Sequence, residues 1–209
     1  MWDETKQGAE RAFIGNGAGI SVLGIFREAV AAKNLKVHLI AHSAGAVLMA
    51  HLLSASDNFG YTIETRSLMA PACTVALYNT HFAPRSRNDS SDAATKVKNI
   101  QIYNLTDELE RDDNVSQLYR KSLLYLVSNA FEGAEPTEST PILGMAKFEN
   151  QITPGGNLEL IHCGIGSPVR SNSKSHSGFD NDTDTMNDIL RHIISGEPEG
   201  KFTKDDLDF

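Results

Sequence analysis

The sequence has few cysteines, no cluster of basic residues and no long apolar run. Its two cysteines, Cys73 and Cys163, form neither a C-x-x-C motif nor a zinc-ligand spacing. No stretch approaches the roughly 20 apolar residues that a membrane helix needs, so no membrane association is expected. The first residues show neither the basic region nor the apolar core of a secretory signal. Together with two lone thiols, this favours a cytoplasmic protein.

The charge balance also excludes a class of partners. The chain has 27 acidic and 19 basic residues and a net charge of -8. Phosphate backbones attract proteins with a basic face, so no nucleic-acid partner is expected. Hydrophobic residues make up 40% of the 209 residues, as in an ordinary globular protein. We expect a single domain over residues 1–196 and an acidic, flexible tail over residues 197–209.

Short apolar segments alternate along the chain with segments of helical periodicity. The predicted strands are residues 35–41, 66–70, 99–105 and 158–163. Helical patterns cover residues 2–13, 22–33, 44–53, 119–130 and 183–195. Such alternation is typical of an α/β fold, with a mainly parallel sheet flanked by helices.

One short segment has the composition of a catalytic turn. Ala41-His42-Ser43-Ala44-Gly45 stands between a predicted strand and a predicted helix. A serine in such a turn holds its hydroxyl clear of the sheet, in a strained backbone conformation. Small residues two positions away on either side let the turn close. The N–H of Ala44, at the start of the helix, is placed to stabilise a developing oxyanion.

Residues 37–53 resemble the nucleophile elbow of the α/β-hydrolase superfamily, with Ala41 in place of the first glycine of G-x-S-x-G. The resemblance implies an α/β-hydrolase-like fold over residues 20–195. It also implies a catalytic triad in the chain order serine, acid, histidine, with Ser43 as the nucleophile.

The resemblance places the acid after the third strand and the base after the last. Asp107 lies two residues beyond the third predicted strand and is our choice, while Glu108 and Glu110 remain alternatives. The base is expected at His176, in a loop before the last helix. His42, next to the nucleophile, is expected to point away from it and to shape the pocket.

The sequence departs from the superfamily at its N-terminal end. Only 42 residues precede Ser43, where superfamily members usually have four further strands and a second oxyanion-hole donor. The segment 35–41 then becomes an edge strand, which invites pairing with another chain. We expect the chain to be either part of a longer hydrolase or a compact variant of the fold. Both alternatives predict association through this edge, and a compact variant would form a homo-oligomer.

The function predicted on these grounds is that of a serine hydrolase cleaving small carboxylic esters through an acyl-enzyme. A peptidase or amidase with the same triad, and a catalytically impaired binding module, remain alternatives. The glycines at 15, 17 and 19 fit a dinucleotide site poorly, because Ile20 replaces the third glycine and no strand precedes them. Alternating aspartates at 180–184 lack the glycine and glutamate of a calcium loop. No metal and no organic cofactor is expected.

Overall fold

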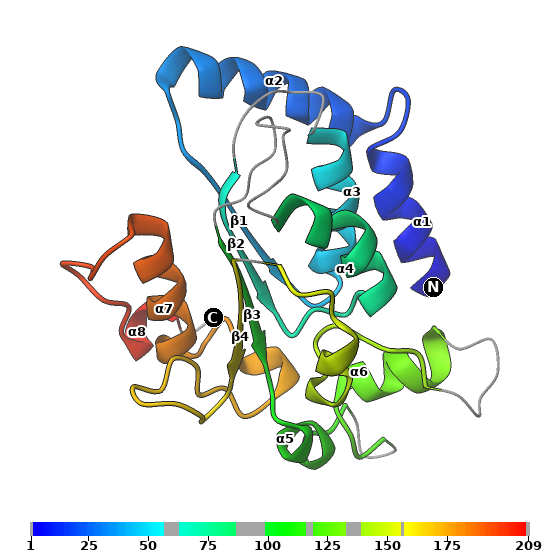
Figure 1. The fold of residues 1–209 in the computed structure, drawn as a ribbon, viewed down its shortest axis with the longest axis vertical. Coiled ribbons are helices and arrows are strands. Elements are labelled where there is room, and N and C mark those ends of the chain that lie inside the picture. The colour runs from blue at the N-terminus through cyan, green and yellow to red at the C-terminus, as the bar shows by residue number, and fades with distance from the viewer. Residues whose placement is uncertain are drawn as a thin grey trace.

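A computed structural model describes residues 2–56, 63–86, 99–115, 119–132, 139–155 and 157–207. At its centre lies a sheet of four parallel strands, arranged in space in their chain order (Figure 1). The strands are β1 (Val37–His42), β2 (Ile63–Met69), β3 (Asn99–Asn104) and β4 (Leu158–His162). All pairings between neighbouring strands are parallel. The predicted α/β class and the four predicted strands are thus confirmed.

Helices cover both faces of this sheet. The helical elements are α1 (Trp2–Ala12), α2 (Ala18–Lys33), α3 (Gly45–Ser56), α4 (Val75–His81), η1 (Ala83–Ser86), α5 (Asp107–Asp112), α6 (Leu123–Leu126), η3 (Val127–Phe131), η4 (Ala146–Gln151), η5 (His176–Gly178), α7 (Thr183–Ile194) and α8 (Lys204–Leu207). In Figure 1, α1, α3 and α4 lie on one side of the strands and α7 on the other. The helix α2 crosses the end of the sheet at which the strands begin.

The two sheet faces bury different residues of the same strands, because successive side chains in a strand point to opposite faces. Leu68 and Ile102 belong to the core beneath α3 and α4. Their neighbours Met69 and Tyr103 belong to a second core that includes Ile189 of α7. The central strands β2 and β3 are therefore buried on both faces, while β1 and β4 at the edges are only partly buried.

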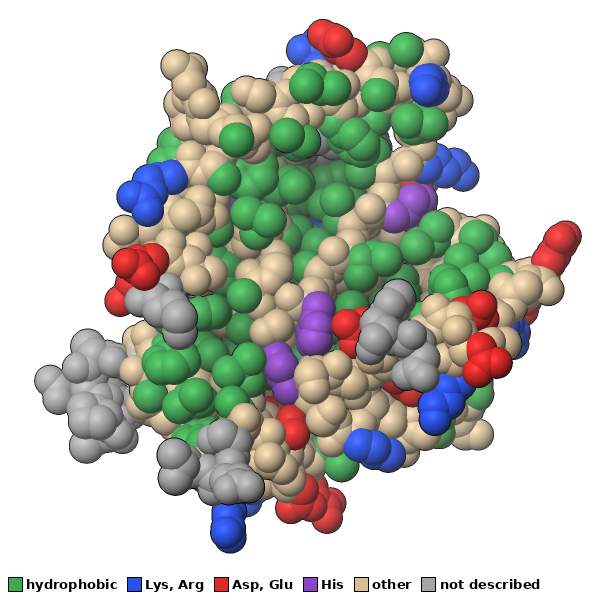
Figure 2. All heavy atoms as spheres, turned by 180° about the vertical axis from the view of Figure 1, so that it is seen from behind, with side chains coloured by type: hydrophobic (Ala, Val, Ile, Leu, Met, Phe, Trp, Pro, Cys, Tyr) green, Lys and Arg blue, Asp and Glu red, His purple; other side chains and the backbone are tan. Residues whose placement is uncertain are grey.

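Within the described residues, β1 pairs only with β2 and forms one edge of the sheet. Its residue Ile40 is 46% exposed, and Val22 and Ile25 of α2 are also exposed. Figure 2 shows apolar side chains gathered on this side of the molecule, on α2 and below it. The edge position of β1 agrees with the sequence analysis, while the expected self-association stays a prediction.

The described part of the tail, residues 197–207, makes contacts with α7, and its expected flexibility stays a prediction. Asn187 of α7 donates to the carbonyl of Phe202 at 2.9 Å and accepts the N–H of Phe202 at 2.7 Å. Leu207 in α8 is buried. The described part of the tail is therefore attached to α7.

No helix in the described ranges is long and apolar enough to cross a membrane.

Candidate active site

Ser43 stands in the turn between the end of β1 and the start of α3, where the sequence placed it. Its φ of 52° lies in the left-handed region, which costs a residue with a side chain about 1–2 kcal/mol. Backbone hydrogen bonds hold the turn on both sides. The N–H of Ser43 donates to the Met69 carbonyl at 2.9 Å, and the Ser43 carbonyl accepts from the Ala72 N–H at 3.0 Å. A strained conformation held in this way is typical of a functional turn.

The residues that flank Ser43 fit the close geometry of this turn. A Cβ atom added to Gly45 would lie 3.4 Å from the Cβ of Ala41, already in van der Waals contact, so little space is left between these two positions. Ala44 precedes the first residue of α3, and among the described residues its N–H donates to no backbone carbonyl. A free N–H at the N-terminus of a twelve-residue helix favours negative charge beside Ser43.

The histidine expected to act as base lies against this turn. His176 Nε2 is 2.9 Å from Ser43 Oγ, although the two residues are 133 positions apart in the chain. His176 begins the short helix η5, between β4 and α7, and is only 6% exposed. When Nε2 accepts the hydrogen bond of the Ser43 hydroxyl, the neutral ring carries its own proton on Nδ1. This atom is buried and has no hydrogen-bond partner within the described residues.

The surroundings of His176 keep its ring neutral. Burial, together with the charge of the nearby His42, lowers the pKa of His176 from 6.5 to about 4. A neutral imidazole is the form that can take a proton from serine, so His176 is ready to act as a base at neutral pH.

This pKa predicts how the reactivity of Ser43 depends on pH. With a pKa of about 4, the His176 ring stays neutral above about pH 5 and is half protonated near pH 4. Covalent labelling of Ser43 should therefore keep its full rate down to about pH 5 and fall to half near pH 4. The rate of adduct formation should be measured by intact mass from pH 4 to 8. Circular dichroism at each pH serves as the control for folding. A midpoint at pH 6.5, the ordinary value for histidine, would contradict the prediction.

The structure does not join the predicted acid to the base. Asp107 is the first residue of α5, and its carboxylate accepts a hydrogen bond from Tyr125 Oη at 2.6 Å. The same carboxylate forms an ion pair with Arg111, one helical turn further on. No hydrogen bond between Asp107 and His176 occurs among the described residues.

A carboxylate that the sequence analysis did not select contacts the base instead. Asp113 follows the last residue of α5, and its Oδ2 accepts the backbone N–H of His176 at 2.7 Å. Its Oδ1 accepts the N–H of Asn114 at 2.8 Å. Residues 107–113 contain five carboxylates, and the sequence alone does not show which of them lies near His176. The folding of α5 places Asp113 there.

The two alternative acids have other surroundings. Glu108 is exposed to solvent, whereas Glu110 is buried and accepts a hydrogen bond from Ser122 Oγ. Burial raises the pKa of Glu110 to about 7. Neither carboxylate hydrogen-bonds to His176 in the described part of the chain.

The raised pKa of Glu110 predicts that stability falls as pH rises. The unfolded chain loses this proton near pH 4.5 and the folded chain only near pH 7, so raising the pH through this interval favours unfolding. Replacing Glu110 with glutamine keeps an acceptor for Ser122 and removes the titration. Relative to wild type, the variant should gain about 2 kcal/mol more in free energy of unfolding at pH 8 than at pH 5. Urea unfolding of both proteins at the two pH values measures this, and equal gains would contradict it.

The other groups with possible chemistry are engaged elsewhere. Four further histidines hydrogen-bond to residues outside the site: His38 to Thr65, His81 to Ser54, His162 to Glu149 and His192 to Gln101. Burial raises the pKa of Cys73 to about 12 and of Cys163 to about 11, so neither thiol is a nucleophile at neutral pH. No cluster suited to a metal ion occurs in the described residues.

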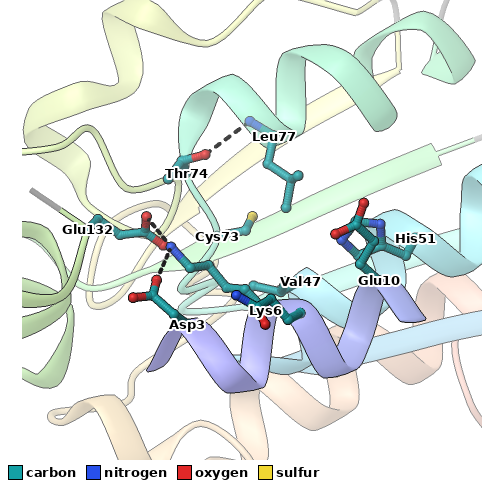
Figure 3. A pocket seen from close by; sticks show the side chains of 10 residues that line it. Asp3, Lys6, Glu10, Val47, His51, Cys73, Thr74, Leu77 and Glu132 are labelled. Carbon is teal, nitrogen blue, oxygen red and sulfur yellow. Dashed lines mark hydrogen bonds and ion pairs between the residues drawn. The ribbon is translucent and has the colours of Figure 1, made fainter. Parts of the chain in front are cut away.

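A pocket of about 350 Å³ lies apart from the Ser43–His176 pair, between α1, α3 and α4 (Figure 3). Lys6 points into it from α1 and forms ion pairs with Asp3 at 3.2 Å and with Glu132 at 2.8 Å. Neither Ser43 nor His176 lines this pocket. Three carboxylates, those of Asp3, Glu10 and Glu132, line it beside the single ammonium group of Lys6, and we assign no substrate to it.

Comparisons with family models, with curated proteins and with solved structures gave no match for this chain. The geometry of the Ser43–His176 pair is therefore what indicates the function.

Proposed function

We propose that the chain is a serine hydrolase of the α/β-hydrolase superfamily, cleaving small carboxylic esters through an acyl-enzyme on Ser43. The observation that carries the proposal is the 2.9 Å distance between Ser43 Oγ and His176 Nε2. The positive φ of Ser43, in a turn from a parallel strand to a helix, supports it. The chain order serine, carboxylate, histidine is also that of the superfamily.

In the proposed mechanism, His176 Nε2 takes the proton of Ser43 as Oγ attacks the ester carbonyl carbon. The N–H of Ala44 stabilises the negative charge that develops on the carbonyl oxygen. His176 then returns the proton to the leaving alcohol, and the C–O bond breaks to give the acyl-enzyme. A water molecule, deprotonated by the same ring, hydrolyses this ester and restores Ser43.

A negative charge near His176 is needed while its ring carries the proton. We propose Asp113 for this role in place of Asp107, because Asp113 hydrogen-bonds to the backbone of His176. The contact is with the backbone N–H of His176, so in this role the charge of Asp113 would act on the ring without a hydrogen bond to it.

A fluorophosphonate probe tests the proposal without knowledge of the substrate. An activated serine displaces fluoride and retains the phosphonyl group, which adds a fixed mass to the intact protein. We expect one adduct on the wild-type chain and none on Ser43→Ala. Hydrolysis of p-nitrophenyl acetate, compared with the matched anilide, then separates esterase from amidase activity.

One observation favours a second candidate, the catalytically impaired binding module. Among the described residues, Nδ1 of His176 has no hydrogen-bond partner, so none of them places a charged group on the second nitrogen of this ring. A wild-type protein that is folded but forms no adduct would support this candidate and contradict the hydrolase.

A further inference from the structure

His42 makes two contacts with His176 from the residue directly before the nucleophile. Its Nε2 lies 2.7 Å from the backbone carbonyl oxygen of His176. Its ring centroid is 5.2 Å from that of His176, with an angle of 31° between the planes, and 6.3 Å from that of Phe179. A carbonyl oxygen only accepts hydrogen bonds, so Nε2 of His42 must be the donor. His42 thus turns toward the base, where the sequence analysis expected it to point away from the nucleophile.

The segment that carries His176 has little regular structure to hold it. The chain between β4 and α7 contains only the three-residue helix η5, and His176 is its first residue. Both backbone groups of His176 are nevertheless bonded to side chains from other elements. Asp113 accepts its N–H at 2.7 Å, and His42 donates to its carbonyl oxygen at 2.7 Å. Together these side chains fix the backbone of His176 on both sides.

Of the two side chains that bond this backbone, His42 is the one adjacent to the nucleophile in the chain. It is the last residue of β1, and Ser43 follows it in a turn that is itself held by hydrogen bonds to Met69 and Ala72. A shift of the His176 carbonyl is therefore resisted by the residue adjacent to Ser43. The distance between Ser43 Oγ and His176 Nε2 then depends on two adjacent residues, His42 at the end of β1 and Ser43 in the turn after it.

We propose that His42 is a positioning residue, whose Nε2–H bond to the His176 carbonyl holds the base at the proton-transfer distance from Ser43. This inference rests on the proposed hydrolase function. Misplacing a catalytic group by about 1 Å can cost on the order of 100-fold in rate, so the effect of losing the bond is measurable.

Two substitutions separate the hydrogen bond from the ring. His42→Phe keeps an aromatic ring against Phe179 and loses the donor, whereas His42→Gln loses the ring and keeps an N–H close to the position of Nε2. We expect His42→Phe to lower kcat for p-nitrophenyl acetate by about 10- to 100-fold, with KM changed less than threefold. His42→Gln should recover kcat to within about threefold of wild type. A merely structural role would instead favour the variant that keeps the ring.

A measurement on the wild-type protein keeps the inference testable if His42→Phe does not fold. Long-range ¹H–¹⁵N spectra of the histidine rings report which nitrogen carries the proton, and we expect Nε2–H for His42. A neutral His42 with its proton on Nδ1 would overturn the inference, because no donor would face the carbonyl.

The kinetic outcomes distinguish this inference from the function on which it rests. Suppose that the wild type is labelled and active. If His42→Phe then keeps the full rate, or if His42→Gln is as impaired as His42→Phe, the role of His42 is overturned while the hydrolase function stands. A folded wild type that forms no adduct overturns the hydrolase and the positioning role together.

Discussion

Replacing Ser43 with glycine is expected to abolish covalent labelling and to give a more stable protein than replacing it with alanine. Both variants lose the nucleophile, and turnover should fall on the order of 10⁶-fold in each. Both also lose the hydrogen bond to His176, so this loss cancels in the comparison. The remaining difference is the φ of 52°, which glycine adopts freely and alanine does not. We expect Ser43→Gly to exceed Ser43→Ala by about 1 kcal/mol in free energy of unfolding.

Urea unfolding of the two variants at neutral pH measures this difference, with wild type as the reference. A difference of about 1 kcal/mol would mean that the turn stores backbone strain to present the hydroxyl. Equal stabilities would show that the turn relaxes when the side chain is absent. An adduct that persists on either variant would show that another residue is the nucleophile, and would contradict the proposed function.

The sheet could be predicted from the sequence because each strand contains a short group of apolar residues next to turn or helix signals. The start of β2 was missed by three residues, since the prediction began at Arg66 and the strand begins at Ile63. Among the missed residues, Glu64 and Thr65 are polar, and Thr65 is buried and hydrogen-bonds to His38 of the adjacent strand. Polar residues that are paired within a sheet break the apolar pattern on which such a prediction depends.

The Ser43–His176 pair was also predictable, although its members are distant in the chain. Ser43 follows the carboxyl end of β1, and His176 lies in the loop that follows the carboxyl end of β4. All carboxyl ends of a parallel sheet lie at the same end of the sheet. The elbow composition selected Ser43, and the loop before the last helix selected His176. What remained hidden was His42, because its bond to a carbonyl in another loop depends on how that loop folds.

The carboxylate that contacts His176 was not predictable, because five carboxylates fall within seven residues. Asp107 was chosen because it lies two residues beyond the strand, where the acid of the superfamily usually lies. The segment forms α5, and Thr106 caps it by accepting the N–H of Leu109. Arg111 then comes within reach of Asp107, as expected for residues four apart in a helix. Asp113 emerges at the far end, beside His176.

The choice between these two aspartates gives the last prediction. Asp113→Asn keeps an oxygen acceptor for the backbone of His176 and removes the negative charge, so the base should stay in place while its protonated form is destabilised. We expect the rate of p-nitrophenyl acetate hydrolysis to fall between about 10²- and 10⁴-fold. Asp107→Asn should stay within about threefold of wild type, because its partners are Tyr125 and the exposed Arg111.

The two variants are matched, since each replaces one carboxylate of the same short segment by its amide. Thermal unfolding of both, measured beside the kinetics, identifies any loss of rate that comes from loss of fold. A large loss in Asp107→Asn with little change in Asp113→Asn would restore Asp107 as the acid and require α5 to move during catalysis. Little change in either variant would mean that no carboxylate assists His176. In that case the low pKa of His176, about 4, would leave it a weak base, and turnover should be slow even with Ser43 fully reactive toward the probe.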